Sequence, residues 1–209
     1  PIQPAENNIL AVMLSGGAAP AAEPAKQEAA VSRTFGLSAP QQGVYVDCLK
    51  NPASTIYNIP TSILLPEGIE PEKVVSAVKA IVKAHPELTV SFGSEGSDVV
   101  QTTHPDIEVD VPVLKVSKEE FAALKADFVK PFNLAQAPLC RFCVAEAEGE
   151  VYLLSDMHHL VSDGASYDIF FRQLCSLLEG GAIDSEQLDY AGFVSREKTT
   201  DLSEAAAFF

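Results

Sequence analysis

The chain has 209 residues, of which 47% are hydrophobic and 21% charged, a composition typical of one globular domain with a sizeable core. Fourteen lysines and arginines against 29 aspartates and glutamates give a net charge of −15, which disfavours binding to nucleic acid or an anionic membrane surface. No apolar run approaches the length of a membrane span and no basic residue precedes the short apolar piece Ile9–Leu14, so neither a membrane segment nor a signal peptide is predicted, and a cytoplasmic location is expected.

The first 33 residues differ in composition from the rest of the chain. The run 16–25, GGAAPAAEPA, consists mainly of small residues and prolines and has almost nothing to bury. Residues 1–33 are therefore predicted to be a flexible Ala/Pro-rich linker, and residues 34–209 the folded part.

The folded part is predicted to open with a helix that starts within Leu37–Tyr45. Ser38 is a suitable N-cap, and Pro40 falls in the first turn, where a proline is tolerated. A strand is predicted over Ile59–Leu65, followed by an amphipathic helix over Pro71–Ala84. The apolar face of that helix consists of Val74, Val75, Val78, Ile81 and Val82.

Further strands and another helix are predicted towards the middle of the chain. The segments Val99–Thr102 and Ile107–Val116 have the apolar, β-branched composition of strands. Ser117 and Glu120 have capping-box spacing, which predicts a helix that starts there and ends at Pro131.

Two strands, Leu139–Ala145 and Val151–Asp156, are predicted next, joined by an acidic turn. Cys140 and Cys143 have CxxC spacing, but positions three apart in a strand face opposite sides of the sheet. The two thiols are therefore not expected to share a zinc ion, and the cysteines are predicted to be buried and reduced.

Two adjacent histidines follow the second of these strands. His158 and His159 lie where that strand ends, and Asp163 and Gly164 lie just before a helix predicted over Ala165–Leu178. Titratable groups at the carboxyl end of a strand, ahead of a helix, are where mixed α/β folds commonly place chemistry. A metal site is disfavoured, because adjacent strand-end residues diverge and no third ligand has a helpful spacing.

The pattern HHxxxDG, formed by His158, His159, Asp163 and Gly164, resembles the signature of the condensation domains of nonribosomal peptide synthetases. These domains belong to the chloramphenicol acetyltransferase-like superfamily. Other segments that resemble family motifs are Ser38 with Gln42 and Tyr45, Ala84–Phe92, Pro131–Arg141 and Leu188–Phe193. Ser91 departs from the family pattern, because members usually carry an arginine there.

The resemblance implies an α/β fold in which a mixed sheet is flanked by helices. It implies that the chain is the N-terminal lobe of the two-lobed family fold, without the C-terminal lobe. The activity implied is amide-bond formation between a carrier-bound acyl or peptidyl thioester and a carrier-bound aminoacyl amine. The lobe is expected to bind no cofactor or metal, since the substrates are presented on the 4'-phosphopantetheine of carrier proteins. Its expected partners are those peptidyl and aminoacyl carrier domains and the C-terminal lobe, with no nucleic acid or membrane partner.

The resemblance also implies a role for each residue of the pattern. His159 is expected to meet the reacting groups, either as a base or as a residue that positions the amine. His158 is expected to pack inward and support the loop. Asp163 is expected to be structural, through a pair with an arginine, and Gly164 to let the backbone approach the substrate.

Three other functions are compatible with this pattern. They are an epimerisation domain, a standalone acyltransferase acting on an alcohol or amine, and a non-catalytic lobe that docks carrier domains. A heterocyclisation domain is disfavoured, because such domains usually replace both histidines with aspartates. The isolated chain is expected to fold but to be inactive, because it would supply only one wall of the tunnel between the two lobes.

Overall fold

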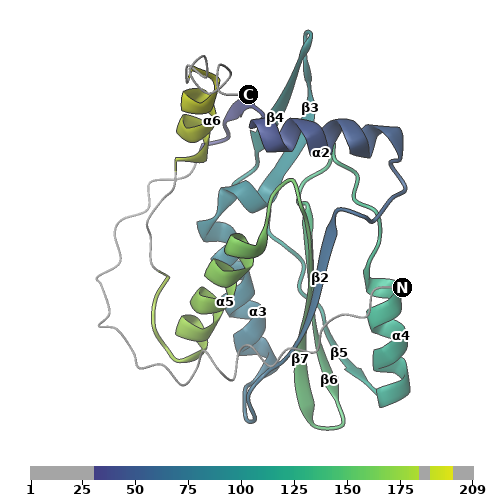
Figure 1. Ribbon diagram of the computed structural model, residues 1–209. Coiled ribbons are helices and arrows are strands. Elements are labelled where there is room, and N and C mark those ends of the chain that lie inside the picture. Colours follow the sequence, from purple (N-terminus) through teal and green to yellow (C-terminus); the bar gives the residue numbers. More distant parts are fainter. Residues whose placement is uncertain (1–30, 184–188, 200–209) are drawn as a thin grey trace, which may run out of the picture.

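The structure, a computed structural model, describes residues 31–183 and 189–199, which form two β-sheets and five α-helices (Figure 1). The strands are β1 (Thr34–Gly36), β2 (Asn58–Leu64), β3 (Val90–Glu95), β4 (Asp98–Thr103), β5 (Val113–Val116), β6 (Cys140–Ala147) and β7 (Glu150–His158). The helices are α2 (Ala39–Lys50), α3 (Pro71–Ala84), α4 (Lys118–Phe128), α5 (Gly164–Leu178) and α6 (Tyr190–Thr199), with the short 3-10 helix η1 (Pro86–Thr89).

The larger sheet has the strand order β2-β7-β6-β5, and the smaller one has the order β1-β4-β3. In the larger sheet β7 pairs antiparallel with both β2 and β6, whereas β5 runs parallel to β6. The mixed α/β architecture expected from the sequence is therefore confirmed. The sequence did not indicate that the strands divide into two sheets, of which the smaller is antiparallel throughout.

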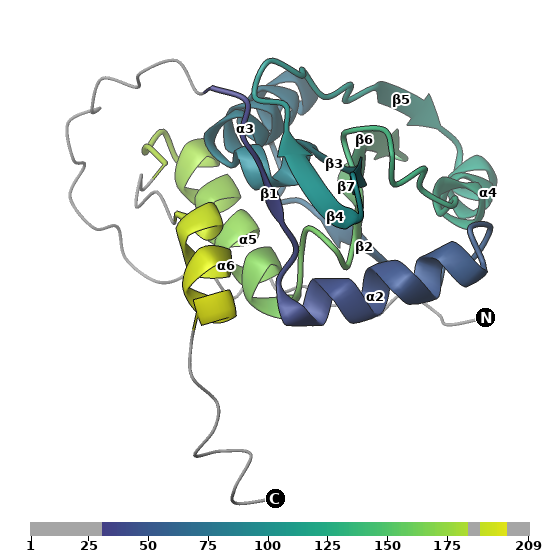
Figure 2. The same ribbon diagram turned by 90° about the horizontal axis from the view of Figure 1, so that it is seen from above.

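Helices cover both faces of the larger sheet. Figures 1 and 2 show α3 and α5 side by side against one face and α4 against the other. On β7 the neighbours Leu153 and Leu154 are both buried, but Leu153 packs in the cluster under α3 and α5 and Leu154 in the cluster under α4. Because successive side chains of a strand alternate between faces, β7 contributes to two cores at once.

The two cysteines of β6 follow the same alternation. Cys140 belongs to the cluster under α3 and α5, and Cys143 to the cluster under α4, so the prediction that they face opposite sides is confirmed. Burial raises the pKa of Cys140 to about 12 and the pKa of Cys143 to about 11, which keeps both thiols protonated. Within residues 31–183 and 189–199, no group of three or more His, Cys, Asp or Glu side chains is arranged to hold a metal ion.

The predicted helix starts are confirmed where a capping signal was present. Ser38 caps α2 and Ser117 caps α4, each in a reciprocal capping box with the residue three positions later, Gln41 or Glu120. α3 has the predicted bounds, and its apolar face is buried against the sheet and α5. α2 and α4 follow from local sequence because the serine that satisfies a first backbone N–H donor lies within one turn of it. α3 has no side-chain cap, and its amphipathic pattern predicts it instead.

The strand predicted over Ile107–Val116 is wrong in its first part, because β5 starts only at Val113. Val109 and Val111 are each 5% exposed and pack in the main core. The apolar residues alternate because one side of this segment is buried, although the segment is not paired as a strand. Pro112 has no N–H to donate, and its carbonyl accepts a single hydrogen bond from Val144 N at 2.9 Å.

The sequence did not predict β1, a three-residue strand that pairs with β4. Just before it, Ser32 Oγ donates to the Thr103 carbonyl at 2.6 Å and Arg33 N donates to Thr103 Oγ1 at 2.9 Å. Most of the predicted linker, residues 1–30, and the helix start predicted over Leu202–Phe209 lie outside the described residues.

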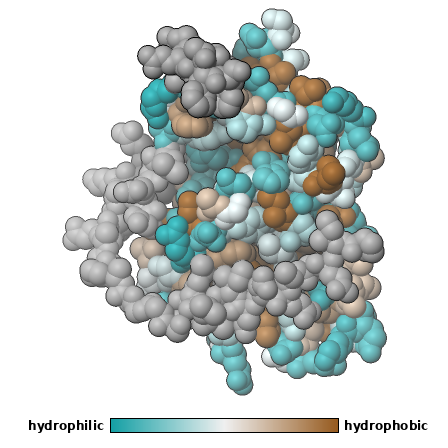
Figure 3. Space-filling view, viewed as in Figure 1, coloured by the Kyte–Doolittle hydropathy of each residue, from teal (hydrophilic) through white to brown (hydrophobic). Residues whose placement is uncertain are grey.

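The face of the molecule in Figure 3 shows no dominant apolar region among the described residues. On the face in Figure 3, hydrophobic residues form separate patches among hydrophilic ones. In the part of the chain that the structure describes, none of the helices has the length and apolar character needed to cross a membrane.

A pair of leucine substitutions tests the position of the core. Leu153 is 0% exposed on β7, whereas Leu49 is 59% exposed on α2. Leu153→Ala removes apolar contacts and leaves a cavity, so it should lower the free energy of unfolding by about 2–5 kcal/mol, and Leu49→Ala by less than about 0.5 kcal/mol. Urea denaturation of the 209-residue chain measures both; equal losses would contradict the packing of β7.

Candidate active site

The histidine pair lies at the end of the central strand of the larger sheet. β7 ends at His158, and α5 begins at Gly164, so the predicted order of strand end, short turn and helix is confirmed. β7 is held on both edges up to its last residue, because Asn58 of β2 pairs with His158 and His158 N donates to the Leu139 carbonyl at 2.9 Å. The chain therefore enters the turn in a fixed orientation.

His158 points into the protein and is 4% exposed. Its Nδ1 accepts a hydrogen bond from Leu160 N at 3.1 Å, so Nδ1 carries no proton and the neutral ring has its proton on Nε2. Nε2 lies 3.7 Å from Cys48 Sγ. The rings of Tyr57 and Phe132 pack against the imidazole, with centroid distances of 6.2 and 5.9 Å.

This environment holds His158 neutral. Burial, with a smaller contribution from the neighbouring His159, lowers the pKa of His158 to about 4. A proton acceptor needs a free lone pair, but Nδ1 is used by Leu160 N and Nε2 carries the proton. His158 is therefore built to shape the turn and not to accept a proton.

His159 has the opposite environment, because its side chain is exposed. Its backbone N donates to the Tyr57 carbonyl at 2.8 Å, one residue before β2, so the main chain is fixed while the imidazole faces solvent. Of the two imidazoles, this is the one that another molecule can reach.

Asp163 is the N-cap of α5. Its Oδ1 accepts hydrogen bonds from Ser166 N at 2.9 Å and Ser166 Oγ at 2.8 Å, and its own N donates to Ser166 Oγ at 3.2 Å. The bonds from Ser166 lower the pKa of Asp163 and keep the carboxylate charged. The sequence analysis did not predict this capping box, although the spacing of three between Asp163 and Ser166 indicates it. The pairing of Asp163 with an arginine stays a prediction.

Gly164 is the first residue of α5 and has open space beside it. A Cβ added there would meet nothing within 4 Å, so packing within the described chain does not require a glycine. The expected reason, approach of the backbone to a substrate, stays a prediction.

A buried pair of glutamines supports the turn from the other side. Gln41 Nε2 donates to the Leu160 carbonyl at 2.8 Å, and Gln101 Nε2 donates to Gln41 Oε1 at 2.8 Å. The sequence reading singled out the neighbouring Gln42, which is exposed and makes one weak bond to the Leu37 carbonyl at 3.4 Å. The capping-box spacing between Ser38 and Gln41 was the signal that could have identified the buried glutamine.

Three comparisons place the chain among known proteins. The sequence matches the Condensation domain family over residues 31–208. It is 31% identical over 186 residues to tyrocidine synthase 2 of Brevibacillus parabrevis, covering 88% of this chain and 5% of that protein. It is 30% identical over 172 residues to surfactin synthase subunit 2 of Bacillus subtilis (strain 168), covering 82% of this chain and 5% of that protein.

Solved structures show the same fold. The starter condensation domain of rhizomide synthetase RzmA superposes with a TM-score of 0.69 at 21% identity, covering 84% of this chain and 45% of that one. The first condensation domain of the calcium-dependent antibiotic synthetase superposes with a TM-score of 0.68 at 18% identity. The match covers 80% of this chain and 43% of that one. The chain thus spans less than half of these solved structures and about a twentieth of the two synthases.

The buried imidazole predicts a dependence of stability on pH. The pKa of His158 is about 4 in the folded state and near 6.5 when unfolded, so the unfolded chain binds more protons between these values. The stabilisation should be fully present above pH 6.5 and should fall by roughly 2–3 kcal/mol as the pH drops to about 4.

The matched variant for this test is His158→Asn, whose side-chain oxygen can still accept from Leu160 N but does not titrate. Urea unfolding of both proteins is measured from pH 7 to pH 4.5. The carboxylates titrate in both proteins, so the difference between the two curves gives the contribution of His158 to the pH dependence of stability. The wild type should lose stability more steeply; parallel curves would show that His158 is protonated without cost.

Proposed function

The chain belongs to the Condensation domain family, and on that premise we propose that it helps to form an amide bond between a carrier-bound acyl or peptidyl thioester and a carrier-bound aminoacyl amine. The observation that carries this proposal is the division within the histidine pair. His158 is buried and neutral, and His159 is exposed on a backbone fixed by Tyr57. An imidazole that is exposed to solvent on a fixed backbone suits a reaction whose substrates arrive from outside the chain.

The reaction does not require a strong base from the protein. The amine nitrogen attacks the thioester carbon, the carbon–sulfur bond breaks, the nitrogen loses a proton and the departing sulfur gains one. An α-amino group has a pKa near 8, so about a tenth of it is neutral at pH 7 without help. His159 would accept the proton as the tetrahedral intermediate forms, or orient the amine by accepting a hydrogen bond from it.

The other residues of the pattern would act by shaping the turn. We expect His158 to hold it through Leu160 N, and Asp163 to fix the start of α5 through Ser166. The open space beside Gly164 would leave room for the substrate backbone. We propose no metal and no resident cofactor for this lobe, since the reaction needs neither.

We further propose that residues 34–209 are the N-terminal lobe of a condensation domain, and that a C-terminal lobe completes the site. The extent of the structural match supports this, because it covers 45% of the solved RzmA domain. Carrier domains bearing 4'-phosphopantetheine would be the partners, and a cytoplasmic synthetase the setting. The part of residues 1–33 that precedes Ser32 would then act as a linker, since Ser32 and Arg33 are hydrogen-bonded to Thr103.

Substitution of His159 tests the proposed chemistry and separates its two forms. In the synthetase that contains this chain, His159→Ala should lower the rate of amide formation by about 100-fold or more, with no loss of stability because the side chain is exposed. His159→Gln keeps a hydrogen-bond acceptor that cannot take up a proton. Recovery of activity in His159→Gln supports a positioning role, and equal loss in both variants supports a base; full activity of His159→Ala would reject the proposal.

The lobe assignment gives a second test. The 209-residue chain alone should show cooperative urea unfolding and yet form no amide product above a His159→Ala control. The same substrates should react with the complete synthetase. Product formation by the isolated chain would show that no second lobe is needed.

A further inference from the structure

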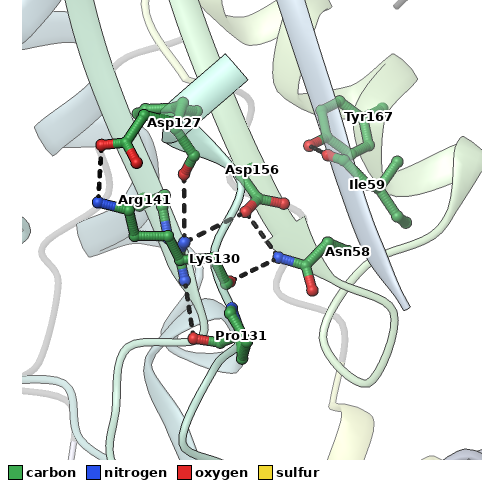
Figure 4. Close-up of polar contacts among 9 residues, drawn as sticks. Asn58, Ile59, Asp127, Lys130, Pro131, Arg141, Asp156 and Tyr167 are labelled. Atoms are coloured by element: carbon green, nitrogen blue, oxygen red, sulfur yellow. Dashed lines mark hydrogen bonds and ion pairs between the residues drawn. The ribbon is translucent and has the colours of Figure 1, made fainter. Parts of the chain in front are cut away.

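We propose that the Asp156 carboxylate positions both histidines of the candidate site, through Asn58 on one side and through Arg141 and Phe132 on the other. The inference deepens the proposed function and rests on it for its catalytic meaning. Figure 4 shows the polar contacts of Asp156, Asn58 and Arg141. They make Asp156, Asn58 and Arg141 positioning residues, because none of them needs to touch a substrate.

Asp156 is a charged residue in the centre of the sheet. It lies on β7 two residues before His158, on the same face, and it is 0% exposed. Its Oδ2 accepts a hydrogen bond from Asn58 Nδ2 at 2.7 Å and lies 3.6 Å from Arg141 Nη1. Asn58 and Arg141 come from the strands on either side of β7, so one carboxylate links three strands.

The route through Asn58 leads to His159. Asn58 is the first residue of β2, and the carbonyl of the preceding Tyr57 accepts the hydrogen bond from His159 N. Asn58 Nδ2 also donates to the Lys130 carbonyl at 3.0 Å, on the segment that joins α4 to β6. Fixing Asn58 therefore fixes the carbonyl that holds the backbone of His159.

The route through Arg141 leads to His158. Arg141 Nη1 donates to the Phe128 carbonyl at 3.2 Å and Nη2 to the Pro131 carbonyl at 3.5 Å, which holds the same segment from the other side. The guanidinium carbon lies 3.8 Å from the centroid of the Phe132 ring, and that ring meets the His158 ring edge-on. The phenyl ring is thus packed between a cation and the buried imidazole.

Stability alone gives little reason for this arrangement. Burying a carboxylate and a guanidinium costs about as much as their attraction returns, and well-packed apolar residues often serve as well. The pKa of Asp156 is raised, because the effect of burial outweighs the opposing effects of the bond from Asn58 and the charge of Arg141. Asp156 Oδ1 and Asn58 Oδ1 are buried without a donor from the described residues, which lowers the stability of the fold. We therefore attribute the arrangement to the geometry that it imposes and not to stability.

The test follows the ring resonances of the four histidines in the 209-residue chain, labelled with 13C at Cε1. Arg141→Lys keeps the charge but removes the guanidinium from the face of the Phe132 ring, and should shift the His158 resonance through that ring. Asn58→Ala should shift His159, and Asp156→Asn should shift both. His85 and His104, bonded to Gln173 and Ser91, are internal references that should not move.

A double-mutant cycle separates positioning from general loosening. If Arg141 acts on His158 through Phe132, then Arg141→Lys should cause no further change in the His158 resonance when Phe132 is already replaced by leucine. In a Phe132→Tyr background, which keeps the aromatic ring, Arg141→Lys should shift the His158 resonance as it does in the wild type. Lys115→Gln breaks the exposed ion pair of Lys115 with Glu146 and should leave all four resonances in place. Unchanged His158 and His159 resonances in Arg141→Lys, Asn58→Ala and Asp156→Asn, or additive shifts in the cycle, would overturn the proposal.

Activity gives the second readout. In the complete synthetase, Arg141→Lys should lower kcat for amide formation by about 10-fold with KM nearly unchanged, because orientation and not binding is lost. An unchanged kcat would overturn the catalytic part of the proposal. The resonance experiment does not depend on the reaction, so full activity of His159→Ala would reject the proposed function without changing that result.

Discussion

The pairing of β7 on both edges is the constraint on which the candidate site depends. β2 and β6 hold β7 up to its last residue, so the strand cannot rotate about its axis and its side chains must alternate between faces. Two adjacent histidines at its end therefore receive opposite environments. His158 enters the interior and His159 remains in solvent, and the difference in their chemistry follows from one step along the backbone.

The turn after β7 is short, and it is held by polar groups from distant parts of the chain. His158 Nδ1 and the Gln41 amide bind the N–H and the carbonyl of the same residue, Leu160. Asp163 fixes the far end of the turn as the cap of α5. A turn held at both backbone groups of one residue and at its exit has little freedom, so the backbone that carries His159 keeps one position relative to the sheet.

The sequence predicted the features whose causes are local. The caps at Ser38 and Ser117, the bounds of α3 and the strand that delivers the histidines all depend on residues within a turn or on simple alternation. It missed one local feature, the capping box between Asp163 and Ser166, and several features whose cause lies far along the chain. The choice of Gln41 over Gln42 depends on a carbonyl 119 positions away, and the link of Asn58 to Asp156 spans 98 positions.

The distribution of buried polar groups separates the part of the fold that provides stability from the part that shapes the site. Apolar clusters pack against both faces of the larger sheet. Several of the buried polar side chains, by contrast, gather around the end of β7: Gln41, Gln101, Asp156, His158 and Ser162. Apolar residues at such positions would avoid the free energy needed to remove polar groups from water. Buried polar side chains therefore indicate positions where function, and not stability, determines the residue. Here they hold the end of β7 and the turn after it, next to the exposed side chain of His159, and this is consistent with the site proposed there.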